Sequence, residues 1–245
     1  MPLVKEEINI IMKIDTHIHS IASGHAFNTI NEIMQESKKK GLELIAITDH
    51  GPNMEGGPHA GYFSMGNRVP RKFDNIEILF GCEANIIDSE GTIDLSYEII
   101  KKLDILLVGF HELTKYSNQG IKENTRALIN ALEKYPIDIV SHPYRKAFPI
   151  CVQEVAYYAA KNNILLELNN SLFTNASIET IEYTRDLIRY MKKYKGKAII
   201  GSDAHILNEI GNDFAIRKLS DELEIEGLEI ICDRERLLEF LKRRH

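Results

Sequence analysis

The sequence predicts an α/β fold, specifically one distorted barrel of parallel strands and surrounding helices, and three observations support this prediction. Short runs of β-branched and other apolar residues alternate with helical stretches along the 245 residues. Most of these runs are continuously apolar, which is typical of parallel strands covered on both faces. No change in composition, internal repeat or linker divides the chain. We therefore expect residues 1–245 to form a single domain, with 1–11 as a candidate N-terminal extension because Met12 as well as Met1 could be the natural start.

Seven segments are expected to be the strands of this barrel. They are Ile10–Asp15, Leu44–Thr48, Ile76–Glu83, Asp104–Gly109, Ile137–Ser141, Ile164–Leu168 and Lys197–Ser202. Because such a barrel usually has eight strands, seven predict a distorted (β/α)7, TIM-like barrel. The expected helices are Thr29–Lys40, Ser96–Lys102, Ile121–Tyr135, Val152–Asn162, Ile178–Tyr194 and Arg234–Arg244. An extended segment near Leu228–Cys232 precedes the last of them.

The composition argues against several classes of protein. A formal net charge of −6 disfavours a protein that binds nucleic-acid backbone over a broad basic face. The three cysteines, Cys82, Cys151 and Cys232, form no CxxC pair, which is typical of a reducing compartment. The apolar run Ile8–Ile14 lacks the features of a signal peptide, and no apolar stretch approaches the about 20 residues that span a bilayer. We therefore expect a cytoplasmic protein that does not contact a membrane.

Residues able to bind metal ions follow nearly every predicted strand. Six of the seven strands end in or beside such residues, which are His17 and His19 in DTHIHS, His50 in TDHG, Glu83 in GCEAN, His111 in GFHE, His142 in SHPY, and Asp203 and His205 in GSDAH. His25 lies in the loop after the first strand, whereas the sixth strand ends in the polar residues Glu167, Asn169 and Asn170. Because functional residues of parallel barrels gather at the C-terminal ends of the strands, we expect the nine residues to meet at one opening.

This set of residues predicts a cluster of divalent metal ions. Alternate residues of a strand point to the same side, so His17 and His19 can chelate one ion together. A polar core of neutral histidines is the poorer account, because each buried imidazole would need a partner. Nine donor groups exceed the three or four ligands of one catalytic zinc, so we expect three ions with Glu83 as a bridging carboxylate. Imidazole-rich ligation favours zinc, with manganese or iron as alternatives.

The motif series resembles that of a known family. DTHIHS, TDHG, a glutamate after the third strand, FHE, SHP and GSDAH are similar to the motifs of the PHP (polymerase and histidinol phosphatase) family, and most similar to its YcdX-like phosphatase branch. The resemblance extends from about Met12 to Leu241 and implies a distorted seven-stranded barrel with a trinuclear centre, usually zinc. By position it assigns one ion to His17, His19, Glu83 and Asp203, a second to His25, His50 and His205, and a third to Glu83, His111 and His142.

The expected activity is that of a metal-dependent phosphoesterase acting on small phosphomonoesters. Three divalent ions bring about six positive charges and the two acids return two, so a surplus of roughly four favours a phosphorylated substrate. The expected reaction is attack by a metal-bound hydroxide, and it needs no protein nucleophile. The water that forms this hydroxide is expected to be held by His17, His19, Glu83 and Asp203. The physiological substrate, the resident metal and the oligomeric state, including a homo-oligomer, are left open.

Further residues are candidates for supporting roles. Asp15 and Asp49 adjoin ligands and are expected either to orient imidazole N–H groups or to cap a strand end or turn. The longest irregular stretch, Gly51–Arg71, is expected to form a rim or lid beside the site. The candidates for substrate contact follow strand ends or lie in this stretch, and they are Arg68, Arg71, Arg145, Lys146, Asn169 and Asn170. For the four basic residues the alternative is a solvated cation on the surface.

Three alternative functions compete with the phosphatase. The first is a phosphodiesterase or exonuclease on single-stranded nucleic acid, which the acidic charge disfavours. The second is a non-catalytic metal-binding or scaffold domain, which the complete ligand set disfavours. The third is a carbon–nitrogen hydrolase of the amidohydrolase type, which commonly has a bridging lysine at strand four, where this chain has His111.

Overall fold

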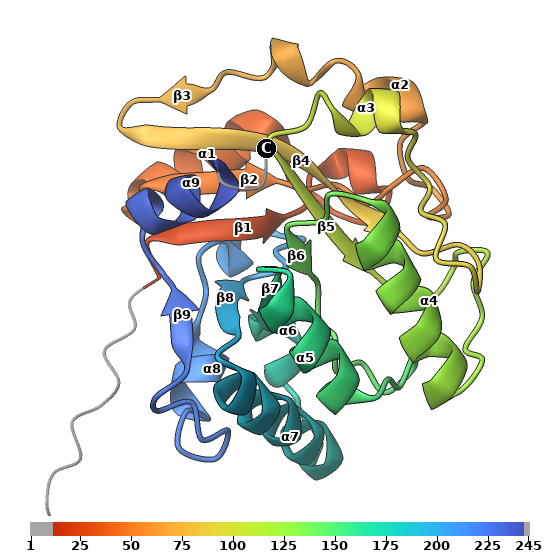
Figure 1. Cartoon of the computed structure of the whole chain (residues 1–245). Helices are drawn as coiled ribbons and strands as arrows, with labels where there is room; N and C mark the ends of the chain where they lie inside the picture. Colours follow the sequence, from red (N-terminus) through yellow and green to blue (C-terminus); the bar gives the residue numbers. More distant parts are fainter. Residues whose placement is uncertain (1–11, 243–245) are drawn as a thin grey trace, which may run out of the picture.

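Eight parallel strands form one curled sheet with helices around it (Figure 1). The structure is a computed structural model and describes residues 12–242. The candidate N-terminal extension and the start of the predicted strand Ile10–Asp15 therefore lie outside the described residues. The sheet order is β1-β2-β4-β5-β6-β7-β8-β9, and the short β3 pairs antiparallel with β4. The strands are β1 Ile14–Ile18, β2 Leu44–Ile47, β3 Lys72–Phe73, β4 Ile76–Asn85, β5 Ile105–Gly109, β6 Ile139–Val140, β7 Leu165–Asn169, β8 Lys197–Gly201 and β9 Glu229–Ile231.

Helices connect the strands and cover the outer face of the sheet. The α-helices are α1 Ile30–Lys39, α2 Ala60–Phe63, α3 Tyr97–Ile100, α4 Ile121–Lys134, α5 Val152–Lys161, α6 Asn170–Phe173, α7 Ile178–Tyr194, α8 Phe214–Lys218 and α9 Arg234–Lys242. Three short 3-10 helices are η1 Ile21–Ser23, η2 Gly66–Arg68 and η3 Leu207–Glu209. Helix α1 begins at a capping box, in which Thr29 and Glu32 each satisfy a backbone N–H of the other.

The barrel closes at one end only. Ile18, at the end of β1, forms a parallel bridge with Ala204, just after β8, and His19 N donates to the Ala204 carbonyl at 2.9 Å. At the other end, β9 lies beside the start of β8, with Lys197 opposite Glu229. The expected TIM-like barrel is therefore confirmed and is distorted. β1 and β8 are bridged at their C-terminal ends, and an eighth parallel strand, β9, pairs with β8 at the other end.

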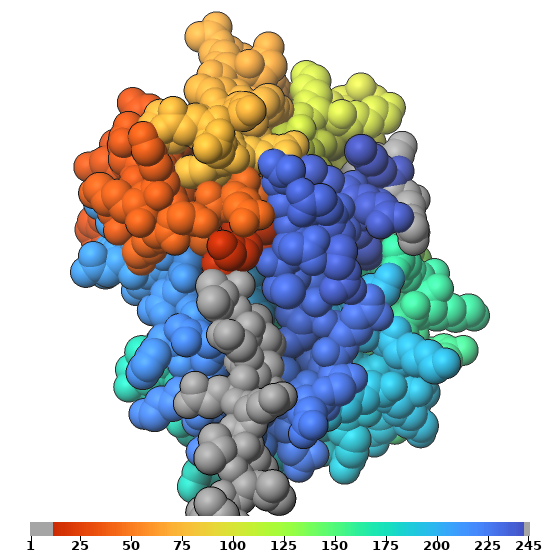
Figure 2. All heavy atoms as spheres, turned by 90° about the vertical axis from the view of Figure 1, so that its left-hand side faces the viewer, coloured from red at the N-terminus to blue at the C-terminus, as the bar shows by residue number. Residues whose placement is uncertain are grey.

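The inside of the barrel has an apolar layer at its N-terminal end. Inward residues of neighbouring strands, among them Ile14, Leu79 and Ile105, pack together with Leu237 and Phe240 of α9. Figure 2 shows the C-terminal segment, in blue, lying against the N-terminal part of the chain, in red and orange. Since α9 closes this end, the polar residues further along the strands can open only toward the C-terminal end. No helix within residues 12–242 is both long enough and apolar enough to cross a membrane.

Candidate metal centre

Glu83 is the central acid of the polar layer at the C-terminal end of the barrel. Its side chain is completely buried on β4. One carboxylate oxygen, Oε1, lies 2.8 Å from His142 Nε2 and 2.9 Å from His111 Nε2. The other, Oε2, lies 2.9 Å from His50 Nδ1 and 3.2 Å from His17 Nε2. One carboxylate therefore contacts imidazoles from four different strand ends.

Asp203 is the second acid, and it lies just after β8. Its Oδ1 is 3.2 Å from His19 Nε2 and 3.6 Å from His17 Nε2. Asp203 has a positive φ of 56°, and His142 has one of 38°. Non-glycine residues adopt this conformation at a cost that the surrounding structure must offset, and such residues cluster at functional sites.

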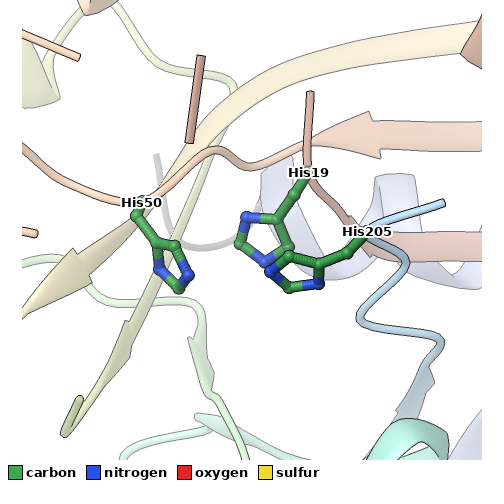
Figure 3. A group of neighbouring side chains, drawn as sticks. All are labelled: His19, His50 and His205. Atoms are coloured by element: carbon green, nitrogen blue, oxygen red, sulfur yellow. The ribbon is translucent and has the colours of Figure 1, made fainter. Parts of the chain in front are cut away.

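The remaining histidines complete the group. Figure 3 shows His19, His50 and His205 gathered from the ends of β1, β2 and β8. The His19 ring centroid lies 4.3 Å from that of His50 and also 4.3 Å from that of His205. The exposed His25 lies 5.0 Å from His50 and 4.9 Å from His205 by the same measure. The structure thus brings all nine residues of the predicted set together at one opening.

The donor atoms fit bound metal ions. Within residues 12–242, four buried side-chain atoms of the group have no hydrogen-bond partner: His17 Nε2, His19 Nε2, His50 Nδ1 and Glu83 Oε2. Leaving such atoms unsatisfied costs free energy, and a divalent ion would satisfy them. Three sets of donor atoms lie within 4.8 Å of one another, and these sets are His17–His19–Glu83, His19–His50–His205 and His50–Glu83–His111.

These sets differ in detail from those that the family resemblance implies. The first set contains the residues implied for the first ion, except that Asp203 is absent from it. In the second, His19 takes the place of His25, and in the third, His50 takes the place of His142. All the expected donor residues are present. Which of them lie close enough to share one ion depends on how their side chains are oriented.

The outward-facing nitrogens of four imidazoles have fixed partners. His17 Nδ1 lies 2.6 Å from Glu167 Oε1, and His205 Nδ1 lies 3.0 Å from the Asp203 carbonyl oxygen. Both of these oxygens can only accept, so each Nδ1 bears the proton. The same holds for His19, because its partner Ser23, 2.9 Å away, donates its single hydroxyl proton to Asp49. His111 Nδ1 lies 2.7 Å from Asn85 Oδ1. In its neutral form, each imidazole therefore has the lone pair on Nε2, facing the centre, as a metal ligand must.

Glu167 was underestimated by the sequence analysis. It lies on β7 on the same inward face as Leu165, and its Oε2 accepts hydrogen bonds from the backbone N–H of His142 at 2.9 Å and from Asn169 Nδ2 at 3.1 Å. A Cβ atom on Gly201 would overlap Glu167 Oε1, so only glycine leaves room for this carboxylate on the neighbouring strand.

Glycine is needed at a second position of the same layer. A Cβ on Gly109 would lie 2.5 Å from Ser141 Oγ and 2.9 Å from the His142 ring. These distances are shorter than van der Waals contact allows. The absence of a side chain at the end of β5 therefore lets the residues after β6 approach the centre.

The two aspartates that the sequence analysis singled out have different roles. Asp49 acts on an imidazole indirectly: its Oδ1 accepts from Ser23 Oγ at 2.7 Å, and Ser23 contacts His19. Its Oδ2 accepts from Tyr62 of α2 at 2.7 Å, which ties the Gly51–Arg71 stretch to the site. Asp15 instead binds backbone N–H groups, including that of Gly211 at 2.7 Å, which agrees with the second of its two expected roles, capping a strand end or turn.

Comparison with known proteins identifies the family. The sequence pattern of the PHP domain matches residues 15–171. The chain belongs to the PHP domain family. It is 42% identical over 219 residues to a protein named "Probable phosphatase" from Caldanaerobacter subterraneus subsp. tengcongensis, covering 89% of this chain and 86% of that one. It is 38% identical to a "Probable phosphatase" from Proteus mirabilis, covering 94% of each chain.

A solved structure shares the fold of this PHP domain. Histidinol phosphate phosphatase from Lactococcus lactis, solved in complex with zinc, L-histidinol and phosphate, superposes with a TM-score of 0.66. The match covers 90% of this chain and 95% of that one at 21% sequence identity. The curled parallel sheet is therefore the PHP form of the TIM-like barrel.

The ionisable groups of the PHP centre are strongly perturbed. Burial disfavours the charged form of His17, but the carboxylates of Glu167, Glu83 and Asp203 outweigh burial and raise the pKa of this imidazole well above its ordinary value. At His111 burial prevails over the attraction of Glu83 and lowers the pKa to about 3. Burial also acts to raise the pKa of Glu83, but the surrounding imidazoles hold it well below its usual range.

A cavity of about 640 Å³ lies above the histidines. Its rim includes Met54 and Glu55, so the first part of the Gly51–Arg71 stretch does border the site. Of the predicted substrate contacts, Arg145 lines this cavity and bonds Glu112 Oε2 at 3.0 Å. Its exposed neighbour Lys146 pairs with Glu179 at 2.6 Å.

The other predicted substrate contacts have different surroundings. Asn169 Nδ2 donates to Asp203 Oδ2 at 3.1 Å, directly beside the centre. Asn170 Oδ1 accepts from the backbone N–H of Ala215 at the start of α8, which is a structural bond. Arg71 pairs with Asp104 at 2.8 Å, just before β5 and so at the opposite end of the barrel, which fits a surface cation and not a substrate contact. Arg68 lies exposed in η2, outside the cavity-lining residues of the described chain.

Proposed function

We propose that this PHP domain is a metal-dependent phosphatase that hydrolyses small phosphomonoesters. The observation that supports this most directly is the Glu83 carboxylate, which contacts four imidazoles under an open cavity while its Oε2 has no hydrogen-bond donor within residues 12–242. The two "Probable phosphatase" relatives and the fold shared with a phosphatase that binds zinc and phosphate agree with this activity.

The proposed ligands are the nine residues that meet at the opening. They are His17, His19, His25, His50, Glu83, His111, His142, Asp203 and His205. Nine donors suit about three ions with Glu83 shared between them, and the predominance of imidazole favours zinc over magnesium or calcium. Bound divalent ions would supply Lewis-acid stabilisation of the phosphoryl oxygens and would activate a water molecule.

The chain's own residues bind and orient the substrate. Arg145, on the cavity wall, is positioned to donate charge-assisted hydrogen bonds to an anionic group of the substrate, with Glu112 holding the guanidinium in place. Met54, Leu113 and Leu172 offer apolar contact to the leaving group. Asn169 steadies Asp203 through its amide, and Glu167 fixes the orientation of His17. A cavity of this size accepts a small organic phosphate with its leaving group.

The test combines metal analysis with a substrate panel on the same sample. Protein purified without chelator is measured by inductively coupled plasma mass spectrometry and assayed on para-nitrophenyl phosphate, sugar phosphates, bis(para-nitrophenyl) phosphate and labelled single-stranded DNA. We expect about three zinc ions per chain and phosphate release from the monoesters. The Glu83→Gln variant should retain fewer ions and lose activity. Release only from the diester or the DNA would favour a phosphodiesterase, and full metal content without turnover of any substrate would contradict catalysis.

A further inference from the structure

Leu113, in the turn after β5, has a backbone conformation that leucine rarely adopts. Its φ is 62°, and within residues 12–242 it is the only apolar residue other than glycine with a positive φ. This left-handed region suits glycine and strains a residue that has a branched side chain. His142 and Asp203, which share this conformation, are candidate metal ligands. Because residues held in this way cluster at functional sites, the conformation of Leu113 calls for a functional explanation.

Hydrogen bonds between two loops hold the backbone of Leu113 in place. Its carbonyl oxygen accepts from the backbone N–H of Glu55 at 3.1 Å. Two residues further on, the backbone N–H of Lys115 donates to Asn53 Oδ1 at 2.8 Å. The segment after β5 is therefore fastened at two points to the segment after β2, and this fixes the direction in which the Leu113 side chain leaves the backbone.

The side chain of Leu113 contributes little to the stability of the fold. It is 67% exposed, whereas a leucine side chain stabilises a protein through the apolar surface that it buries. It lines the cavity of about 640 Å³ above the histidines, together with Met54 from the segment after β2 and Leu172 of α6. Three separate loops thus each contribute one apolar side chain to the wall of the cavity.

We propose that Leu113 is a specificity-determining residue that selects phosphomonoesters whose leaving group is uncharged and apolar, such as aryl phosphates. When the phosphoryl group lies at the metal centre, the leaving group lies in this cavity, where contact with Leu113, Met54 and Leu172 removes apolar surface from water. The carboxylates of Glu55 and Glu112 on the rim disfavour a leaving group with a second negative charge. The selection of substrates rests on the proposed function, whereas the preference of the cavity for an apolar ligand does not.

The substitution Leu113→Gly separates a role in selectivity from a role in stability. Glycine adopts a positive φ without strain, but it removes the apolar contact. We therefore expect the Tm to stay equal or to rise. The ratio of kcat/KM for phenyl phosphate to that for methyl phosphate should fall by roughly 4- to 15-fold, the equivalent of one or two buried methylene groups. The intrinsic reactivities of the two esters cancel when this ratio is compared between the variant and the unmodified protein.

Two further variants control for the backbone and for the chemistry of the side chain. Lys195→Gly relieves a positive φ of 57° at an exposed residue after α7, outside the cavity-lining residues of the described chain, and should leave the ratio unchanged. Leu113→Met keeps an apolar side chain in the cavity and should preserve most of the ratio. An equal loss of selectivity in Lys195→Gly would contradict the assignment to Leu113.

Binding of phosphonates separates this inference from the proposed function. Phenylphosphonate and methylphosphonate carry the same charged group and are not hydrolysed, so isothermal titration calorimetry on zinc-loaded protein compares them without turnover. We expect the unmodified protein to prefer phenylphosphonate, and Leu113→Gly to lose this preference by the same factor as the kinetic ratio. No preference in the unmodified protein, an unchanged preference in Leu113→Gly, or a lowered Tm of that variant would overturn the inference, even if monoesters are hydrolysed. If the preference depends on Leu113 but no monoester is hydrolysed, the proposed function fails and the assignment of the cavity stands.

Discussion

Glu167 Oε1 lies 2.6 Å from His17 Nδ1, and the other oxygen of the same carboxylate accepts the backbone N–H of His142 at 2.9 Å. One buried acid on β7 therefore holds candidate ligands from the ends of two other strands. It orients the ring of the first and supports the positive φ of the second. Both effects lie outside the metal ligands themselves.

Replacing Glu167 with glutamine should weaken zinc binding. Both oxygens of Glu167 face N–H donors, so an amide NH₂ must oppose one of them. Loss of such a partner to a metal-binding histidine typically costs 10- to 100-fold in affinity, and we expect a decrease in this range. Chelator-competition titration measures it. The matched control is Glu133→Gln, an exposed position on α4, and an unchanged affinity in Glu167→Gln would show that the orientation of His17 does not depend on this acid.

Removal of metal should lower the thermal stability of the protein. Within residues 12–242, four buried nitrogen and oxygen atoms of the centre have no hydrogen-bond partner, and bound ions would satisfy them. Zinc at a hundred times its dissociation constant contributes about 2.7 kcal/mol per site to the free energy of unfolding. For a chain of this length that corresponds to roughly 5–10 °C in Tm. Differential scanning calorimetry before and after chelation, and after zinc is restored, checks the change, and equal Tm values in all three samples would contradict it.

Zinc binding should release a proton near neutral pH. Because the carboxylates around His17 raise its pKa, this imidazole is protonated in the metal-free protein at pH 7, and a ligand must give up that proton. Burial lowers the pKa of His111 to about 3, so this imidazole is neutral and releases no proton when it binds zinc. Zinc affinity should therefore rise with pH until the pH passes the pKa of His17, and level off above it. Isothermal titration calorimetry in two buffers of different ionisation enthalpy counts the protons, and a binding enthalpy independent of buffer would refute this account.

Arg145 should affect substrate binding more than the chemical step. A hydrogen bond to a charged group contributes about 1.5–3 kcal/mol, so Arg145→Ala should raise KM by roughly 10- to 100-fold with a smaller change in kcat. Steady-state kinetics on the preferred monoester gives both constants. Lys146→Ala removes the adjacent cation, which pairs with Glu179, and should leave KM unchanged. The same effect in both variants would indicate general electrostatics instead of a direct contact.

Most of the fold was predictable because parallel strands covered on both faces are continuously apolar. All seven predicted strands are present, and the extended segment near Leu228–Cys232 proved to be the eighth, β9. The first strand continues to Ile18, past the predicted end at Asp15, because Thr16 and His17 are polar yet buried inside the barrel. The two-residue β3 and the short helices α2, α6 and α8 were missed, since segments this short leave no periodic pattern.

The site was predictable in its residues and less so in its arrangement. Residue type and position after a strand identify the donors, because strand ends of a parallel barrel share one opening. Glu167 gave no such signal: its partner His17 is 150 positions away in sequence, and the bond depends on which strands become neighbours. Arg68 and Arg71 misled for a related reason, because only the first part of the Gly51–Arg71 stretch borders the opening, whereas Arg71 lies beside Asp104.

Gly109 and Gly201 limit how this centre could be built into another protein. A designer who transplanted the nine donor residues onto a foreign barrel would meet Cβ atoms where the Ser141 hydroxyl and the Glu167 carboxylate have to lie. The imidazoles would then be present but tilted, with their lone pairs aimed past a common point. A working graft needs two empty positions on β5 and β8 as much as it needs nitrogen and oxygen.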